Sequence, residues 1–191
     1  MTLKTNIQTK KSNNNVRELV VTSMFTAVIC VMSQLSIQIQ PIPFTLSLFA
    51  IFLTGALLPP RSAFLATLTY LLLGAFGLPV FAGFKGGIQI LAGMTGGYLV
   101  AYPVMAFLIS IFYKYLKKFN KILSLTIGML VALIFCYTFG TIWFTFITDT
   151  AFYTALTLCV FPFLLFDLAK IVFAIIVSII IRKTVFNHNN L

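Results

Sequence analysis

Six long apolar runs, separated by short polar or Pro- and Gly-containing segments, constrain the fold of this chain more than any other feature. An α-helix needs roughly 20 mostly apolar residues to cross a bilayer, and the runs approach that length. Charged residues make up only 8% of the chain, whereas about 25% is usual in soluble domains. This leaves too little polar surface for a water-soluble enzyme, a disordered chain or a secreted disulfide-linked fold. The sequence therefore predicts an all-α, polytopic membrane protein built as a six-helix bundle.

The predicted bundle is a single domain with a polar segment at each end. We expect a polar N-terminal tail over residues 1–17, a six-helix membrane domain over 18–183 and a polar C-terminal tail over 184–191. The predicted spans are about 18–38, 43–58, 62–76, 95–113, 122–147 and 162–181, with a short interfacial helix over 150–160.

Local signals mark the ends of several spans. Pro43 and Pro162 are each suited to open a helix, because proline at the first helical position loses no hydrogen bond. Polar and apolar residues alternate over Ser33–Gln40, a period-2 pattern that favours a helix passing into an extended segment.

Basic residues set the predicted orientation. They lie before the first predicted span and after the second, fourth and sixth spans. In a chain that crosses the membrane six times, all of these positions are on the same side. By the positive-inside rule this side is the cytoplasm, and both termini are cytoplasmic. The arrangement accounts for the net charge of +10 without a nucleic-acid partner. Eleven of the 13 Lys and Arg residues follow it: Lys4, Lys10, Lys11, Arg17, Arg61, Lys114, Lys117, Lys118, Lys121, Arg182 and Lys183.

Two charges lie inside a predicted span. Asp167 and Lys170 follow Pro162 in a run that is otherwise apolar, and their i,i+3 spacing places them on one helix face, close enough to pair. A charge at membrane depth costs at least about 2.5 kcal/mol unless it is paired or hydrated, so such residues usually mark a site or a pathway. A structural ion pair that holds helices together is the alternative, and a ligand can share the same pair.

A Gly-rich connection before the fourth span is the second candidate feature. The first glycines of this connection are Gly83, Gly86 and Gly87. Glycines allow close backbone approach and leave N–H groups free for an anion. Irregular backbone at membrane depth is tolerated where it is buried in protein or lines a wet cavity. A flexible outer loop is the alternative. Lys85 lies in the same segment, and Gln34 and Tyr98 are predicted on the same outer side.

The predicted pocket is suited to binding and not to catalysis. It contains one acid, Lys side chains, amides and aromatic rings, but no Ser–His or Cys–His arrangement and no second carboxylate. Cys30, Cys136 and Cys159 lie in apolar runs and are expected to be packing residues, and His188 lies in the polar C-terminal tail. No metal or cofactor is predicted, and the absence of a Walker motif means that this chain alone cannot use ATP.

Four segments of the chain carry a resemblance to a known family, namely Pro41–Leu46, Leu73–Gly83, Thr95–Leu99 and Pro162–Lys170. They resemble the BioY family, the biotin-specific substrate-binding subunit, or S component, of energy-coupling-factor (ECF) transporters. The resemblance runs from about Val20 to Lys183. It implies a protein of a bacterial plasma membrane that captures biotin from outside. It also implies three partners, a membrane T component and two cytoplasmic ATPases.

Biotin suits the predicted pocket chemically. Its ureido ring carries two N–H donors and a carbonyl acceptor, its thiophane ring is apolar, and its tail ends in a carboxylate. An ionised Asp167 can accept a ureido N–H, while Lys170 can hold the aspartate, donate to the ureido oxygen or meet the carboxylate. Phe81, in the second matching segment, joins the predicted biotin site. That site comprises Asp167, Lys170, Lys85, Gly83, Gly86, Gly87, Gln34, Tyr98 and Phe81.

Small residues on the first span indicate a packing face. Ser23 and Ala27 form a small-xxx-small pattern that lets membrane helices approach closely, and Cys30 continues the same face. The family resemblance suggests that this face docks on the T component, whereas packing inside the bundle is the alternative.

Three further functions remain open from the sequence. One is an autonomous secondary transporter, and another is an S component for a biotin-related vitamin such as dethiobiotin. The third is an intramembrane enzyme that uses Asp167, which the missing partner acid, histidine and metal ligands disfavour.

Overall fold

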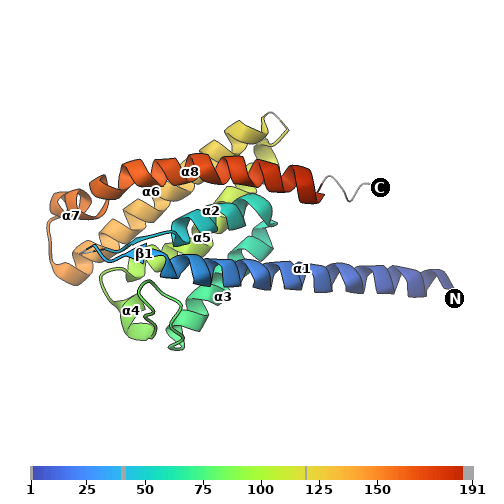
Figure 1. The fold of residues 1–191 in the computed structure, drawn as a ribbon, viewed down its shortest axis with the longest axis horizontal. Coiled ribbons are helices and arrows are strands. Elements are labelled where there is room, and N and C mark those ends of the chain that lie inside the picture. The colour runs from blue at the N-terminus through green and yellow to red at the C-terminus, as the bar shows by residue number, and fades with distance from the viewer. Residues whose placement is uncertain (1, 40–41, 119, 187–191) are drawn as a thin grey trace.

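The computed structural model describes residues 2–39, 42–118 and 120–186, and most of these residues are helical. Figure 1 shows the long helices side by side, with α1 beginning at the end of the molecule where α8 finishes. The short elements α4, α7 and β1 lie at the opposite end. In chain order the elements are α1 (Thr2–Gln34), β1 (Ser36–Ile37), β2 (Phe44–Thr45), α2 (Ser47–Leu57), α3 (Pro60–Ala75), α4 (Ile88–Ala92), α5 (Gly96–Leu116), α6 (Lys121–Thr148), α7 (Phe152–Cys159), α8 (Phe161–Ile181) and the π-helical η1 (Arg182–Phe186).

Within the described residues, four stretches of helix are long and apolar enough to cross a membrane, namely Asn15–Gln34, Gly96–Leu116, Lys121–Thr148 and Phe161–Thr184. The helices α2 and α3 have 11 and 16 residues. At about 1.5 Å per residue both are shorter than a hydrocarbon core of about 30 Å. The all-helical architecture is therefore confirmed, while the count of six spans and the cytoplasmic location of both termini stay predictions.

The connection between α1 and α2 differs from the prediction in one respect. The helix α1 ends at Gln34 and passes into β1, as the alternating pattern indicated. The prediction that Pro43 opens the second span is wrong, because the next two residues form β2 and α2 begins only at Ser47. Antiparallel pairing of Ser36–Ile37 with Phe44–Thr45 holds this backbone extended and overrides the helix-start preference of proline.

Other boundaries agree more closely with the prediction. Pro162 lies in the first turn of α8, and α7 falls within the segment predicted as a short helix. The segment predicted as a polar N-terminal tail is helical from Thr2 onward, as part of α1.

The short helix α2 forms the centre of the bundle. It packs against α1, α5 and α8, and Ala50, Ile51, Phe52 and Ala56 are fully buried. Polar side chains inside the bundle are satisfied as well. No buried side-chain nitrogen or oxygen among the described residues lacks a hydrogen-bond partner. Such satisfaction is what a lipid environment demands, because no water is present to pair with a buried polar group.

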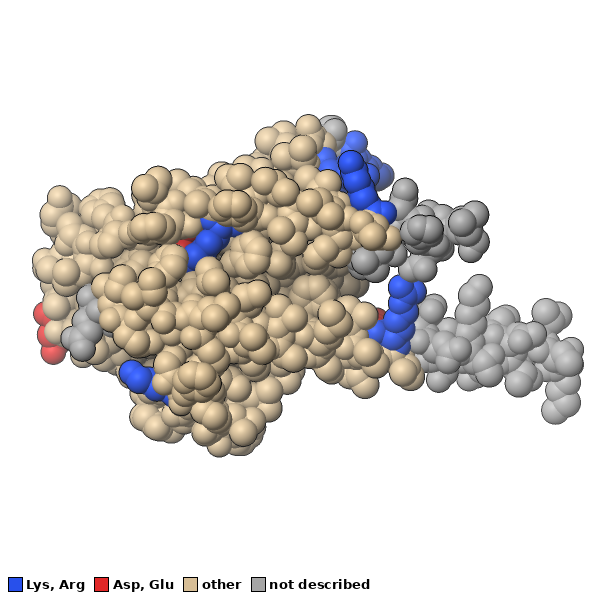
Figure 2. Space-filling view, viewed as in Figure 1, with Lys and Arg blue, Asp and Glu red and all other residues tan. Residues whose placement is uncertain are grey.

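Most of the basic side chains of the described residues gather at one end of the molecule. Figure 2 shows most of the blue Lys and Arg atoms toward the end where α8 finishes, with smaller groups elsewhere on this face. The helices α5 and α6 meet at the same end, and both carry lysines there, Lys114 in the last turn of α5 and Lys121 at the start of α6. The alternating direction of the helices thus brings basic groups from distant parts of the sequence to one end.

The close contact between α2 and α5 makes Gly55→Ala a direct test of the packing. A Cβ atom at Gly55 would lie 2.8 Å from the backbone oxygen of Ala106 and from Cβ of Ile109, so the two helices would have to separate. We expect a loss of about 1–3 kcal/mol in the free energy of unfolding, measured as a lower melting temperature in detergent. If the two helices were not in close contact, Gly55→Ala would instead raise the free energy of unfolding, because alanine in a helix interior is favoured over glycine by about 1 kcal/mol. Ile134→Ala, at an exposed position of α6, is the control and should change the melting temperature little.

Candidate functional site

The two charges predicted to pair inside a span are in contact. Lys170 Nζ lies 2.7 Å from Asp167 Oδ1, and both residues are on α8. The two residues are only 7% and 4% exposed. Asp167 follows the start of α8 by six residues, so it lies about 9 Å along the helix from that start, which α7 directly precedes. The pair is therefore a buried ionic group near the end opposite to the basic side chains.

Lys170 also joins α8 to β2. Its Nζ donates to the backbone oxygen of Thr45 at 2.8 Å and lies 4.0 Å from the centre of the Phe44 ring. The Phe44 ring in turn stacks on Phe163 of α8. A cation over an aromatic face is attracted by the ring quadrupole, most strongly where water is excluded. The ammonium is thus held by a carboxylate, a carbonyl and a ring at once.

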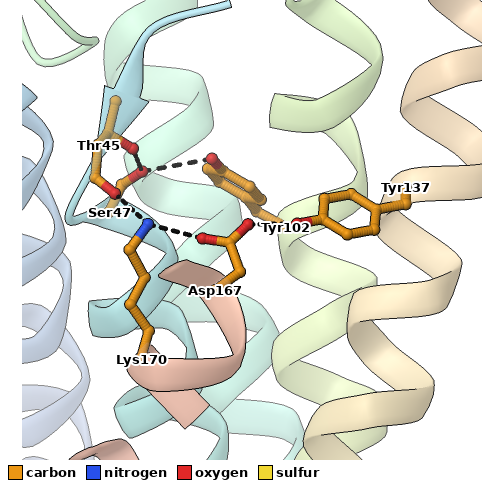
Figure 3. Close-up of polar contacts among 6 residues, drawn as sticks. All are labelled: Thr45, Ser47, Tyr102, Tyr137, Asp167 and Lys170. Carbon is orange, nitrogen blue, oxygen red and sulfur yellow. Dashed lines mark hydrogen bonds and ion pairs between the residues drawn. The ribbon is translucent and has the colours of Figure 1, made fainter. Parts of the chain in front are cut away.

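Hydroxyl groups from α5 and α6 complete the polar cluster, as Figure 3 shows. The Tyr137 hydroxyl of α6 donates to Asp167 Oδ2 at 2.5 Å. On the other side, the Ser47 hydroxyl lies 2.6 Å from the Thr45 hydroxyl and 3.3 Å from that of Tyr102 on α5. Five elements, β2, α2, α5, α6 and α8, therefore contribute polar groups to one small region.

A pocket lies at this cluster. Its walls are mostly apolar and aromatic, with the ion pair and the hydroxyls as polar groups, which is the usual composition of a small-molecule site. The open space inside is about 60 Å³, whereas sites for vitamin-sized ligands usually hold about 300–1,000 Å³. A ligand of that size needs a wall of the pocket to move. The lining residues are Ile42, Pro43, Phe44, Thr45, Leu48, Tyr98, Tyr102, Cys136, Tyr137, Cys159, Phe163, Asp167 and Lys170.

Three of the nine predicted site residues line this pocket, namely Asp167, Lys170 and Tyr98. The Tyr98 hydroxyl lies 3.2 Å from Thr141 Oγ1 of α6, and its ring covers Gly140.

Gln34 holds the Gly-rich connection and does not line the pocket. Its Oε1 accepts from the backbone N–H of Phe84 at 2.9 Å, and its Nε2 donates to the backbone oxygen of Pro79 at 3.3 Å. Gly83 and Gly87 have φ angles of +73° and +102°, a region that residues with a Cβ rarely adopt. These two glycines are thus explained by the shape of the connection.

The remaining predicted residues also lie in this connection, outside the pocket lining. Lys85 is exposed and pairs through its backbone with Phe81. Phe81 is buried, with its ring edge-on to Tyr70. Gly86 lies against the backbone oxygen of Leu78. The structure therefore brings the predicted residues together in two groups, the ion pair with Tyr98 and the Gly-rich connection with Gln34.

Several pocket residues were missed by the sequence analysis. Tyr102 follows Tyr98 by four residues and shares its helix face, so this spacing was an available signal. Thr45 and Phe44 lie in a segment that resembles the BioY family. Tyr137 carried no local signal, because its role arises from the packing of α6 against α8.

Ser23 and Ala27 lie far from the pocket, on the outer face of α1. Both are exposed and line a groove of about 870 Å³ beside α3, together with Thr22, Cys30 and Ser62 among others. The structure leaves both side chains exposed, and docking of this face on the T component stays a prediction.

A buried ion pair in a mostly apolar pocket, set among helices long enough to cross a membrane, defines a membrane-embedded binding protein. Among the described residues, no group of three or more His, Cys, Asp or Glu side chains could hold a metal ion. The chain belongs to the BioY family, whose model matches residues 5–187.

Known relatives and a solved structure agree with this assignment. The biotin transporter BioY of Thermotoga maritima is 38% identical over 87% of this chain and 96% of its own length. The biotin transporter BioY2 of Lactococcus lactis is 36% identical over 93% of this chain and 96% of its own. A crystal structure of the S-component for biotin from an ECF-type ABC transporter superposes with a TM-score of 0.84 at 29% identity, covering 90% of this chain and 94% of that one. These names describe transport proteins, which confirms the expectation that this chain is not an enzyme.

The ion pair yields a prediction about stability. Lys170→Met leaves the Asp167 carboxylate buried without its cation, and we expect a loss of about 3–5 kcal/mol in the free energy of unfolding. Asp167→Asn combined with Lys170→Met removes both charges and should recover most of that loss. Thermal unfolding in detergent measures both variants, with Lys85→Met at an exposed position as the control. A double variant as unstable as Lys170→Met would contradict the ionic origin of the effect.

Proposed function

We propose that this chain is the S component of an ECF-type transporter and that it captures biotin in the pocket around Asp167 and Lys170. The observation that carries the proposal is the buried pair itself, which lies in the pocket of a chain whose relatives are named as biotin transporters. Asp167 accepts a ureido N–H, and the aromatic walls, with Phe44, Tyr98 and Phe163, enclose the apolar thiophane ring.

The strand β2, with the two residues before it, is proposed to be the wall that moves to admit biotin. Ile42 to Thr45 form one side of the pocket, and two residue pairs join β2 to β1 in the described part of the chain. The remaining predicted residues, with Lys85 and the Gly-rich connection, are proposed to meet the carboxylate end of biotin once this wall has opened.

The proposed orientation places the basic end of the molecule in the cytoplasm. In this arrangement both termini are cytoplasmic, the pocket faces the outside of a bacterial plasma membrane, and α2 and α3 act as short spans within a bundle of six. The gathering of Lys and Arg at one end supports this orientation, because basic residues are retained on the cytoplasmic side during insertion.

The proposed partners are a membrane T component and two cytoplasmic ATPases. The exposed groove along α1 supports a docking role for Ser23 and Ala27, because small residues allow a partner helix to approach closely. No cofactor is proposed, and biotin is the transported ligand. An autonomous secondary transporter and an S component for dethiobiotin are the alternatives that the experiments below separate.

Ligand binding is tested by isothermal titration of the detergent-solubilised chain, preceded by mass spectrometry of small molecules that co-purify with it. We expect Asp167→Asn to weaken biotin binding roughly 10- to 100-fold, because a hydrogen bond to a charged group contributes about 1.5–3 kcal/mol. Lys170→Ala should have a comparable effect, and Lys85→Ala a smaller one unless Lys85 holds the carboxylate. Asp149→Asn, an exposed substitution at a left-handed helix end, is the matched control. Unchanged affinity in both α8 variants would place the biotin site elsewhere.

Docking is tested with Ala27→Trp, which fills the groove beside α3 without touching the pocket. We expect assembly with the T component or biotin uptake to be lost while biotin binding to the isolated chain is retained. Val172→Trp, on an exposed part of α8, controls for the bulk of the indole. Equal loss of binding and assembly in Ala27→Trp would mean that this face serves the bundle itself.

A further inference from the structure

Tyr137 makes a contact that the proposed function does not yet use. In the part of the chain that the structure describes, the two side chains that donate to Asp167 are Lys170 on the same helix and Tyr137 on α6. The Tyr137 contact, at 2.5 Å, joins α6 to α8 through two residues that are 30 positions apart in the sequence. Tyr137 is half-buried and lines the pocket.

The direction of this hydrogen bond follows from the charges. An ionised carboxylate can only accept, so the Tyr137 hydroxyl must donate its proton to Asp167 Oδ2. Lys170 donates to the other oxygen, Oδ1. A carboxylate offers about four lone-pair positions, and two donors from two helices therefore fix its plane and leave about two positions for a ligand.

We propose that Tyr137 is a positioning and specificity residue of the ligand site, which orients Asp167 and makes it prefer a neutral N–H donor over a cationic one. This inference rests on the proposed function, since the neutral donor is the ureido group of biotin. It adds a role for a residue of α6 that acts through Asp167.

Asp167 prefers a neutral donor because Tyr137 and Lys170 already share the negative charge of its carboxylate. Short, charge-assisted hydrogen bonds are roughly twice as strong as neutral ones and draw on the electron density of the acceptor. With Tyr137 and Lys170 both donating, Asp167 keeps less charge for a cation in the pocket. Without the Tyr137 hydroxyl, the carboxylate loses its fixed orientation, which weakens a directional N–H bond, and regains charge, which favours a cation.

The experiment compares biotin with 2-iminobiotin, in which a guanidine that is protonated at neutral pH replaces the ureido group. We expect Tyr137→Phe to weaken biotin binding about tenfold, the loss of roughly one charged hydrogen bond. Binding of 2-iminobiotin should weaken less or improve, so that the ratio of the two dissociation constants shifts about fivefold or more toward the cation. Titration, with competition against biotin for weak ligands, measures both constants.

Tyr70→Phe is the matched control. Its hydroxyl lies 2.8 Å from Ser33 Oγ in the core, and Tyr70 does not line the pocket. It removes the same atom from a buried tyrosine and should leave the ratio unchanged, even where it lowers the melting temperature. Equal weakening of both ligands by Tyr137→Phe would overturn the inference and make Tyr137 a packing residue.

A double-mutant cycle of Tyr137→Phe and Asp167→Asn, measured with biotin alone, tests independently whether Tyr137 acts through Asp167. If Tyr137 acts through Asp167, then Tyr137→Phe has little further effect on biotin binding in the Asp167→Asn background, whereas independent roles would give additive losses and overturn the inference. The two hypotheses fail separately. A wild-type chain that does not bind biotin overturns the proposed function, and one that binds biotin with additive losses overturns only the role of Tyr137.

Discussion

The cost of burying a carboxylate and an ammonium among apolar helices governs the local structure at one end of this protein. Neither Asp167 nor Lys170 can be stable there alone, and their mutual contact leaves further donors and acceptors to satisfy. The ammonium of Lys170 donates to the carbonyl of Thr45, and the carboxylate of Asp167 accepts from the hydroxyl of Tyr137. These contacts join α8 to β2 and to α6, so the pair fixes how a short strand and two long helices meet.

The two ends of the bundle are held by different chemistry. At the basic end, Arg182 donates to the backbone oxygen of Ala56 in the last turn of α2 and lies 4.0 Å from the ring of Tyr113 on α5. At the pocket end, Lys170 reaches Thr45, just before the start of α2. The helix α2 is thus linked near both of its ends, at one end to the middle of α8 and at the other to the residue that directly follows α8. A change in the pocket that moves β2 acts directly on the central helix of the bundle.

Local geometry explains which features could be predicted. The i,i+3 contact of Asp167 with Lys170 and the extended segment after α1 depend on residues close in sequence, and both are present. The helix start at Pro43 was wrong because pairing with β1, a contact across the connection, outweighs local preference. Tyr137 and Thr45 were missed as partners of the pair for the same reason, since their places depend on packing between segments 30 and 125 residues apart. The predicted binding roles of the Gly-rich connection rested on topology and family resemblance. In the structure, contacts with Gln34 account for the shape of this connection.

The small volume of the pocket connects stability with affinity. Every buried polar side chain among the described residues already has a partner, and the open space is about 60 Å³. In the proposed function, a vitamin-sized ligand displaces the wall at β2 and exchanges existing contacts, including that of Lys170 with Thr45, for new ones. The observed affinity is then the intrinsic affinity multiplied by the fraction of molecules in which the wall is open. Because about two lone-pair positions of Asp167 are unused, a ligand can add hydrogen bonds there without breaking those to Lys170 and Tyr137. In this proposal the ion pair stays intact with and without ligand, and the free-energy cost of opening is limited to moving β2 and the residues beside it.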